Sequence, residues 1–126
     1  MIDKQKHIEY WIKNAENEIE TANILISQNR ILHGLFFCHM VIEKAPKAHV
    51  VKTTGEIPPK SHNLIHLAEL AKIVLPEEDE SFLGILMKYQ LKSRYPGNSI
   101  KIPSGELTDF YFNKTKTLLK WLKEKL

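Results

Sequence analysis

The chain has 126 residues, of which 43% are hydrophobic and 26% are charged, and these proportions are typical of a globular protein. They exclude a disordered tail, a collagen-like fibre and a disulfide scaffold, because the single cysteine, Cys38, cannot form an internal bridge. The formal net charge of +3 permits contact with nucleotides or RNA without requiring it.

The length fits one domain over residues 1–126. No apolar stretch approaches the roughly 20 residues that cross a bilayer, and the N-terminus lacks the pattern of a signal peptide. A lone cysteine also fits a reducing compartment. We therefore expect a single-domain cytoplasmic protein with no membrane contact.

The first predicted helix has apolar residues at alternating steps of four and three, which place them on one face against an antiparallel neighbour. These residues are Ile8, Ile12, Ala15, Ile19, Ala22 and Ile26. Asp3 is expected to cap the start of this helix, and Asn29 to adopt the left-handed turn after its end. The second predicted helix, residues 31–52, is apolar nearly all round and is therefore expected to be central. Pro46 lies inside it, where we expect a kink without a break.

Three further helices are predicted, and no segment alternates with the period of a strand. The third covers about residues 62–73, with Ser61 as its cap. The fourth begins near Pro76, with acidic residues 77–80 at the positive end of its dipole. The fifth runs from about residue 104 to the C-terminus and is expected to bury Leu107, Phe110, Tyr111, Leu118, Trp121 and Leu122. The predicted fold class is all-α: an antiparallel up-and-down bundle of four to five helices with short connections.

A polar stripe runs along the central predicted helix, because His39, Glu43 and Lys47 recur every four residues. Lys44 lies next to it. One interpretation is an intrahelical pair of Glu43 and Lys47 at a solvent-exposed edge. The other is a polar pocket between helices, in which Lys44 or Lys47 meets a phosphate and Glu43 orients a partner. The spacing leaves both interpretations open.

Two histidines, His62 and His66, are four residues apart on the third predicted helix, and Glu69 is the further candidate ligand at helical spacing. Zinc requires more protein ligands than two histidines supply, so no metal site is predicted. His62 is interpreted either as a residue that serves the start of the helix or as a contact for an anion.

Arg94 and Tyr95 follow the fourth predicted helix in the sequence SRYP. The guanidinium of Arg94 matches the geometry of a phosphate or a carboxylate, and Tyr95 is suited to stacking on a base or packing the turn. The alternative for Arg94 is a residue that serves the helix dipole and pairs with Glu43.

Motifs of several enzyme classes are absent from the sequence. The five glycines form no phosphate-binding loop, and no Gly-x-Ser-x-Gly elbow occurs. Cys38 lies on the apolar central helix and is interpreted as a small core residue and not as a nucleophile. Trp11 and Trp121 are interpreted as core or interface residues. No catalytic residue and no cofactor are predicted.

Three short motifs, in this order, resemble the HEPN family of small prokaryotic helical domains. Residues 34–48 resemble the family's aromatic-rich helix that ends in Glu-Lys-Ala-x-Lys-Ala. Residues 58–64, PPKSHNL, resemble its next element, a short loop followed by histidine, a polar residue and leucine. Residues 93–96, SRYP, resemble its arginine–tyrosine–proline turn.

The resemblance implies a helical bundle, often a homodimer, that is encoded beside a minimal nucleotidyltransferase and is thought to bind nucleotides or nucleic acid. Many members are ribonuclease toxins whose site is an arginine followed four to six residues later by a histidine. This sequence departs from that motif, because no histidine follows Arg94 and His33 follows Arg30 too closely.

The leading hypothesis is a non-catalytic homodimeric module that binds a nucleotide or nucleic acid and partners a minimal nucleotidyltransferase in a two-gene, toxin–antitoxin-like system. Its polar contacts are expected from His39, Glu43, Lys44, Lys47, His62, Arg94 and Tyr95. The first alternative is a metal-independent endoribonuclease with His39 or His62 as base and Arg94 stabilising the phosphate charge. The second is a dimeric scaffold without a small ligand. The dimer is also expected because the central helix carries more apolar surface than short neighbours readily cover.

Overall fold

The computed structural model describes residues 2–90 and 100–126, and within these residues the chain is helical without strands. The helices are α1 (Lys4–Ser27), α2 (Ile31–Thr54), α3 (Leu64–Leu70), α4 (Glu77–Met87) and α5 (Gly105–Glu124). The predicted all-α bundle is therefore confirmed. None of the helices in the described ranges combines the length and the apolar character needed to cross a membrane.

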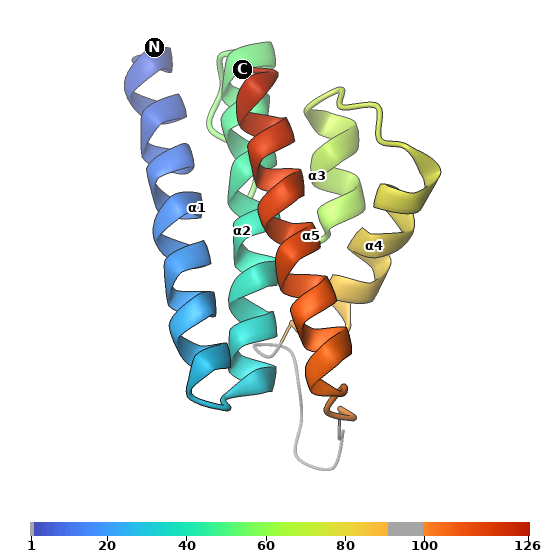
Figure 1. Ribbon diagram of the computed structural model, residues 1–126. Helices are drawn as coiled ribbons and strands as arrows, with labels where there is room; N and C mark the ends of the chain where they lie inside the picture. Colours follow the sequence, from blue (N-terminus) through green and yellow to red (C-terminus); the bar gives the residue numbers. More distant parts are fainter. Residues whose placement is uncertain (1, 91–99) are drawn as a thin grey trace.

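The central position predicted for α2 is confirmed. α1, α2 and α5 are long rods that lie side by side, while the shorter α3 and α4 cover the remaining side (Figure 1). α2 contacts each of the other helices, which explains why it is apolar nearly all round. The helix continues through the buried Pro46 without interruption, as predicted.

Two of the predicted helix ends are confirmed in atomic detail. The Asp3 carboxylate accepts a hydrogen bond from the backbone N–H of Lys6 at 3.1 Å, which caps α1. After α1, Asn29 has a φ of 61°, the left-handed conformation that its short polar side chain tolerates. The Ser104 hydroxyl caps α5 in the same way as Asp3 caps α1.

The predicted start of the third helix is wrong. α3 begins at Leu64, and its cap is Asn63, whose side chain accepts from the backbone N–H of His66 at 3.0 Å. Ser61 instead accepts a hydrogen bond from the backbone N–H of Asn63, which shapes the turn ahead of the helix. His62 therefore precedes α3 in a loop, and His62 and His66 do not share a helix.

The connection between α2 and α3 turns the chain back along α2. It begins at Gly55, whose φ of 72° is favoured in glycine and ends α2. The chain then returns beside α2 so far that His62 meets Glu43 in the middle of that helix. From there α3 runs in the same direction as α2 (Figure 1), which brings Ala68 next to Pro46 and Ala71 next to His49. Among helices that follow one another in the chain, this pair is the exception to the expected antiparallel order, and α5 also runs in the same direction as its neighbour α2 (Figure 1).

The buried face of α5 differs from the prediction. Leu107 and Phe110 were expected to point inward, but they are 40% and 57% exposed. Two threonines, Thr108 and Thr115, lie in the core in their place. Their hydroxyls donate to the carbonyls of Ser104 and Tyr111, four residues earlier, so no polar atom is left unpaired by the burial.

Cys38 is a core residue, as predicted. It is fully buried on α2, and burial raises the pKa of its thiol to about 12, against the lowering effect of a hydrogen bond with Thr115. The thiolate that reacts as a nucleophile is therefore scarce at neutral pH.

The close contact of α1 and α2 depends on Gly34, and this can be tested by substitution. A Cβ atom there would lie 2.5 Å from Cγ1 of Ile26 and 3.3 Å from the carbonyl oxygen of Ala22. Gly34→Ala is expected to lower the free energy of unfolding, because overpacking costs about 1–3 kcal/mol and exceeds the gain in helix propensity of about 1 kcal/mol.

Gly84→Ala is the matched control, because a Cβ atom at Gly84, inside α4, meets nothing within 4 Å. The control is expected to raise the free energy of unfolding by about 0.5–1 kcal/mol. Urea denaturation of both variants measures the difference. Equal stabilisation by the two substitutions would contradict the role given to Gly34.

Candidate functional site

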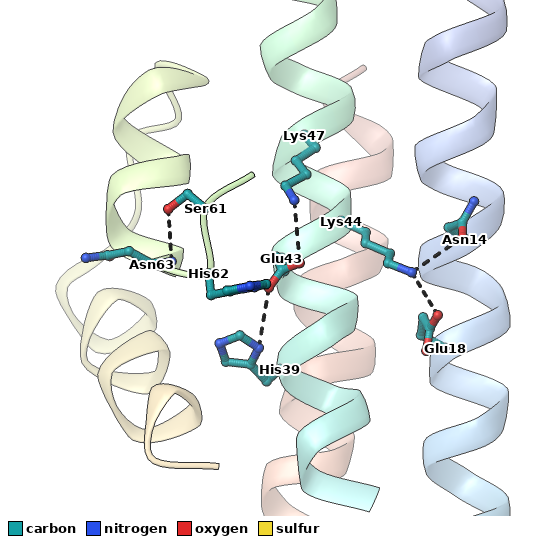
Figure 2. A network of polar contacts seen from close by, with 9 residues as sticks. All are labelled: Asn14, Glu18, His39, Glu43, Lys44, Lys47, Ser61, His62 and Asn63. Atoms are coloured by element: carbon teal, nitrogen blue, oxygen red, sulfur yellow. Dashed lines mark hydrogen bonds and ion pairs between the residues drawn. The ribbon is translucent and has the colours of Figure 1, made fainter. Parts of the chain in front are cut away.

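The polar stripe predicted on α2 forms the centre of a buried cluster. His39, Glu43 and Lys47 lie one above another on the same face of the helix, and all three are buried (Figure 2). The Lys47 ammonium lies 3.5 Å from Oε2 of Glu43. The pair expected at a solvent-exposed edge therefore exists, but it lies between helices, where burial of its charges is costly unless they are hydrogen-bonded.

His62 makes the shortest hydrogen bond to this pair. Its Nδ1 lies 2.7 Å from Oε1 of Glu43, although the two residues are 19 positions apart. The turn made by Ser61 and Asn63 directs the ring back toward α2 (Figure 2). We call His39, Glu43, Lys47 and His62 the Glu43 cluster.

The hydrogen bond to Glu43 determines what His62 presents to solvent. An ionised carboxylate only accepts hydrogen bonds, so Nδ1 of His62 carries the hydrogen and donates it. In the neutral ring, Nε2 then has a free lone pair. The side chain is 47% exposed, so an outside ligand can reach the ring. Glu43 thus holds an exposed acceptor in a fixed orientation.

His39 is the least satisfied member of the cluster. It is 0% exposed, and neither ring nitrogen has a hydrogen-bond partner. Its Nδ1 lies 3.9 Å from Oε1 of Glu43, beyond hydrogen-bonding distance. Burial lowers the pKa of His39, and the negative charge of Glu43 opposes this effect. The ring is consequently a neutral polar group beside the carboxylate.

Trp11 is a neighbour of the cluster that sequence reasoning did not assign to it. The Lys47 ammonium lies 5.2 Å from the centre of the Trp11 ring, a cation–π contact between α2 and α1. The indole nitrogen of Trp11 is buried without a partner. No signal in the sequence could have identified this contact, because the two residues lie on different helices.

The remaining predicted site residues lie elsewhere. Lys44 points toward α1, where its ammonium lies 2.9 Å from Oε1 of Glu18 and 3.4 Å from Oδ1 of Asn14 (Figure 2). It is therefore paired, and it faces away from the Glu43 cluster. Arg94 and Tyr95 lie outside the described residues. In the described parts of the chain, no group of three or more His, Cys, Asp or Glu side chains is arranged so that it could hold a metal ion.

The charges of the Glu43 cluster nearly cancel. Lys47 contributes one positive charge and Glu43 one negative charge, while His39 is neutral. When the His62 ring carries a single hydrogen, on Nδ1, its Nε2 is an acceptor that pairs with a hydroxyl or amino group, whereas a phosphate needs a donor. The cluster is thus suited to a sugar hydroxyl or to a base more than to a phosphate.

The buried histidines predict how stability depends on pH. Burial lowers the pKa of His39 and of His49 below the ordinary 6.5, so below pH 6.5 the unfolded chain binds more protons than the folded chain. The free energy of unfolding is expected to fall as the pH drops below 6.5, by up to about 1.4 kcal/mol per pH unit for each ring. Urea midpoints between pH 5 and pH 8 check this, and His39→Leu is expected to flatten the dependence. An unchanged slope in that variant would contradict the assignment.

Comparison with known proteins identifies the family of the chain. The chain is similar to an archaeal HEPN homologue, ST0689, whose crystal structure superposes with a TM-score of 0.71 at 26% sequence identity, covering 94% of this chain and 96% of that one. A search of the curated proteins finds no match. The sequence model of the HEPN domain matches residues 8–125, nearly the whole of the chain. The protein belongs to the HEPN domain family.

Proposed function

We propose that this protein is a non-catalytic module that binds a nucleotide or nucleic acid. The observation that supports this is the hydrogen bond of 2.7 Å between the buried Glu43 and the half-exposed His62. Burying the Glu43 carboxylate costs stability, and its hydrogen bond to His62 offsets this cost. The same bond holds the His62 ring at the surface in one orientation. Such an oriented acceptor fits the hydroxyl of a ribose or the amino group of a base.

The Glu43 cluster also unites two of the three motifs by which the sequence resembles the family. Glu43 and Lys47 come from the aromatic-rich helix, and His62 from the loop that follows it. Because these segments meet at the Glu43–His62 hydrogen bond, a ligand contact at His62 depends on residues from both. We propose this meeting point as the contact surface for the nucleotide.

Calorimetric titration tests the proposal with AMP, ATP, GTP and a short single-stranded RNA as probes. His62→Ala is expected to weaken binding of at least one probe by about tenfold, the loss of one well-oriented hydrogen bond. His66→Ala is the control, because His66 is an exposed histidine on α3 outside the cluster, and its affinity is expected to stay within about twofold. Equal affinities in the wild type and in His62→Ala would refute the proposal, as would no binding of any probe.

An endoribonuclease is the second candidate, and one observation favours it. A carboxylate bound to Nδ1 of a histidine, with Nε2 free, is the arrangement of an oriented general base. In that case Nε2 of His62 takes the proton of a ribose 2′-hydroxyl as its oxygen bonds to the adjacent phosphorus, the P–O5′ bond breaks, and the 5′ oxygen leaves with a proton from water. Incubation with total RNA decides between the candidates: cleavage by the wild type that is lost in His62→Ala favours the enzyme, and intact RNA favours the binding module.

We also propose that the module forms a homodimer and partners a minimal nucleotidyltransferase in a two-gene, toxin–antitoxin-like system. Membership in the family supports both parts, and the exposed Leu107 and Phe110 on α5 provide apolar surface for a protein contact. Light scattering at micromolar concentration checks the dimer, and a monomer would contradict it. Copurification under native conditions checks the nucleotidyltransferase, whose absence from the purified complex would count against the partnership.

A further inference from the structure

A second pocket lies away from the Glu43 cluster, where the C-terminal parts of α2 and α5 meet the segment that follows α3. Its volume is about 410 Å³, and it is lined by His49, Ala71, Lys72, Ile73, Val74, Trp121 and Lys125. This size falls within the range of small-molecule sites. In Figure 1 this is the end of the bundle at which both chain termini lie.

The charged side chains that line this pocket are all cationic. Lys72 and Lys125 line it, no carboxylate does, and neither ammonium has an ion-pair partner among residues 2–90 and 100–126. The other surface pockets differ, because each includes carboxylates: Asp79 between α4 and α5, Glu16, Glu20 and Glu124 between α1 and α5, and Glu69 and Glu80 beside α3. The pocket therefore has an excess of positive charge that the described residues do not neutralise.

The positive charge of the pocket affects His49, which lines it. Its Nε2–H donates to the carbonyl of Leu122 at 2.8 Å, since a carbonyl oxygen can only accept. Burial lowers the pKa of His49, and the charges of Lys52 and Lys125 lower it further, against the raising effect of the bond to Leu122. Lys52 thus adds a third cation near the pocket.

The ammonium of Lys125 is held by a contact at the pocket, and the backbone of Lys72 has an unusual conformation. The Lys125 ammonium lies 4.5 Å from the centre of the Trp121 ring, a cation–π contact that keeps the charge at the pocket. Lys72 has a φ of 57°, at the position after a helix end where glycine is preferred. A lysine in this conformation is strained relative to glycine, so its side chain is present at a cost to the fold.

Apolar side chains line the pocket beside Lys72 and Lys125. Val74 is 88% exposed, and it lines the pocket together with Ile73 and Trp121. Exposed apolar surface next to unpaired cations matches a ligand that combines an anionic group with a flat apolar body.

We propose that this pocket binds an organic phosphate that carries a flat ring, with the phosphate between Lys72 and Lys125 and the ring against Val74 and Trp121. The proposal rests on the nucleotide-binding function proposed above and deepens it, because it places phosphate recognition apart from the electrically balanced Glu43 cluster. A free nucleoside monophosphate and the phosphorylated end of an RNA strand share the required chemistry.

NMR titration of the full chain tests the proposal, with the indole resonances of Trp11 and Trp121 as separate reporters. AMP is expected to shift the resonance of Trp121, whereas adenosine, which lacks the phosphate, is expected to leave it in place. A 5′-phosphorylated oligoribonucleotide and its 5′-hydroxyl counterpart distinguish the two sources: AMP alone acting indicates a free nucleotide, and the phosphorylated strand acting more strongly indicates an RNA end.

Variants that replace one lysine by the uncharged glutamine identify the residues that bind AMP. Lys72→Gln and Lys125→Gln are each expected to weaken AMP binding by about tenfold. Lys123→Gln is the matched control, because Lys123 lies on the same helix but pairs with Glu16 at 2.7 Å in the groove between α1 and α5. An equal loss in the control would overturn the assignment.

Lys72→Gly separates binding from folding. Glycine relieves the left-handed conformation, so this variant is expected to raise the midpoint of urea unfolding while it weakens AMP binding. Binding that persists in Lys72→Gln and Lys125→Gln, and shifts His62 but not Trp121, would overturn the second pocket and leave the proposed function intact. If neither AMP nor the phosphorylated strand binds at millimolar concentration, the second pocket is refuted, and the calorimetric titration with ATP, GTP and unphosphorylated RNA decides the proposed function separately.

Discussion

The hydrogen bond between Glu43 and His62 is the interaction on which the candidate site depends. The Glu43 side chain in the middle of the central helix is only 5% exposed, so removal of His62 would leave this carboxylate without its shortest hydrogen bond. Its partners come from its own helix, through Lys47, and from the loop before α3, through His62. The same contact therefore stabilises a buried charge and holds the loop before α3 against α2.

The sequence predicted well what is set by neighbours along the chain. Asp3 and Asn29 act within one turn of their own helix ends, and the spacing of Glu43 and Lys47 follows from the helical repeat. Contacts between distant segments were not predictable in this way. The partner of Lys44, for example, is Glu18 on another helix, and periodicity carries no information about which helix faces which.

Two predictions, for the buried face of α5 and for the start of α3, were wrong for the same physical reason. In both places, polar side chains form hydrogen bonds with the nearby backbone. Phe110 was expected to be buried because it is apolar, yet the helix turns Thr108 and Thr115 inward, since their hydroxyls bond to the preceding turn. Similarly, Ser61 was assigned as the cap of α3, whereas it shapes the turn that lets Asn63 act as the cap. In both places the sequence offers two residues of suitable chemistry, and tertiary packing selects between them.

Because α3 is short, the order of one of its ends depends on the order of the other. It has seven residues, too few to be stable in isolation, so its order is maintained by the side chains that pack on it and by its caps. The Glu43 cluster lies at the beginning of α3, and the second pocket, with Lys72 and Lys125, lies at its end. Any contact that immobilises α3 at one end leaves less configurational freedom to be lost when the other end is immobilised, so the order of the two ends is thermodynamically linked even without a change of shape.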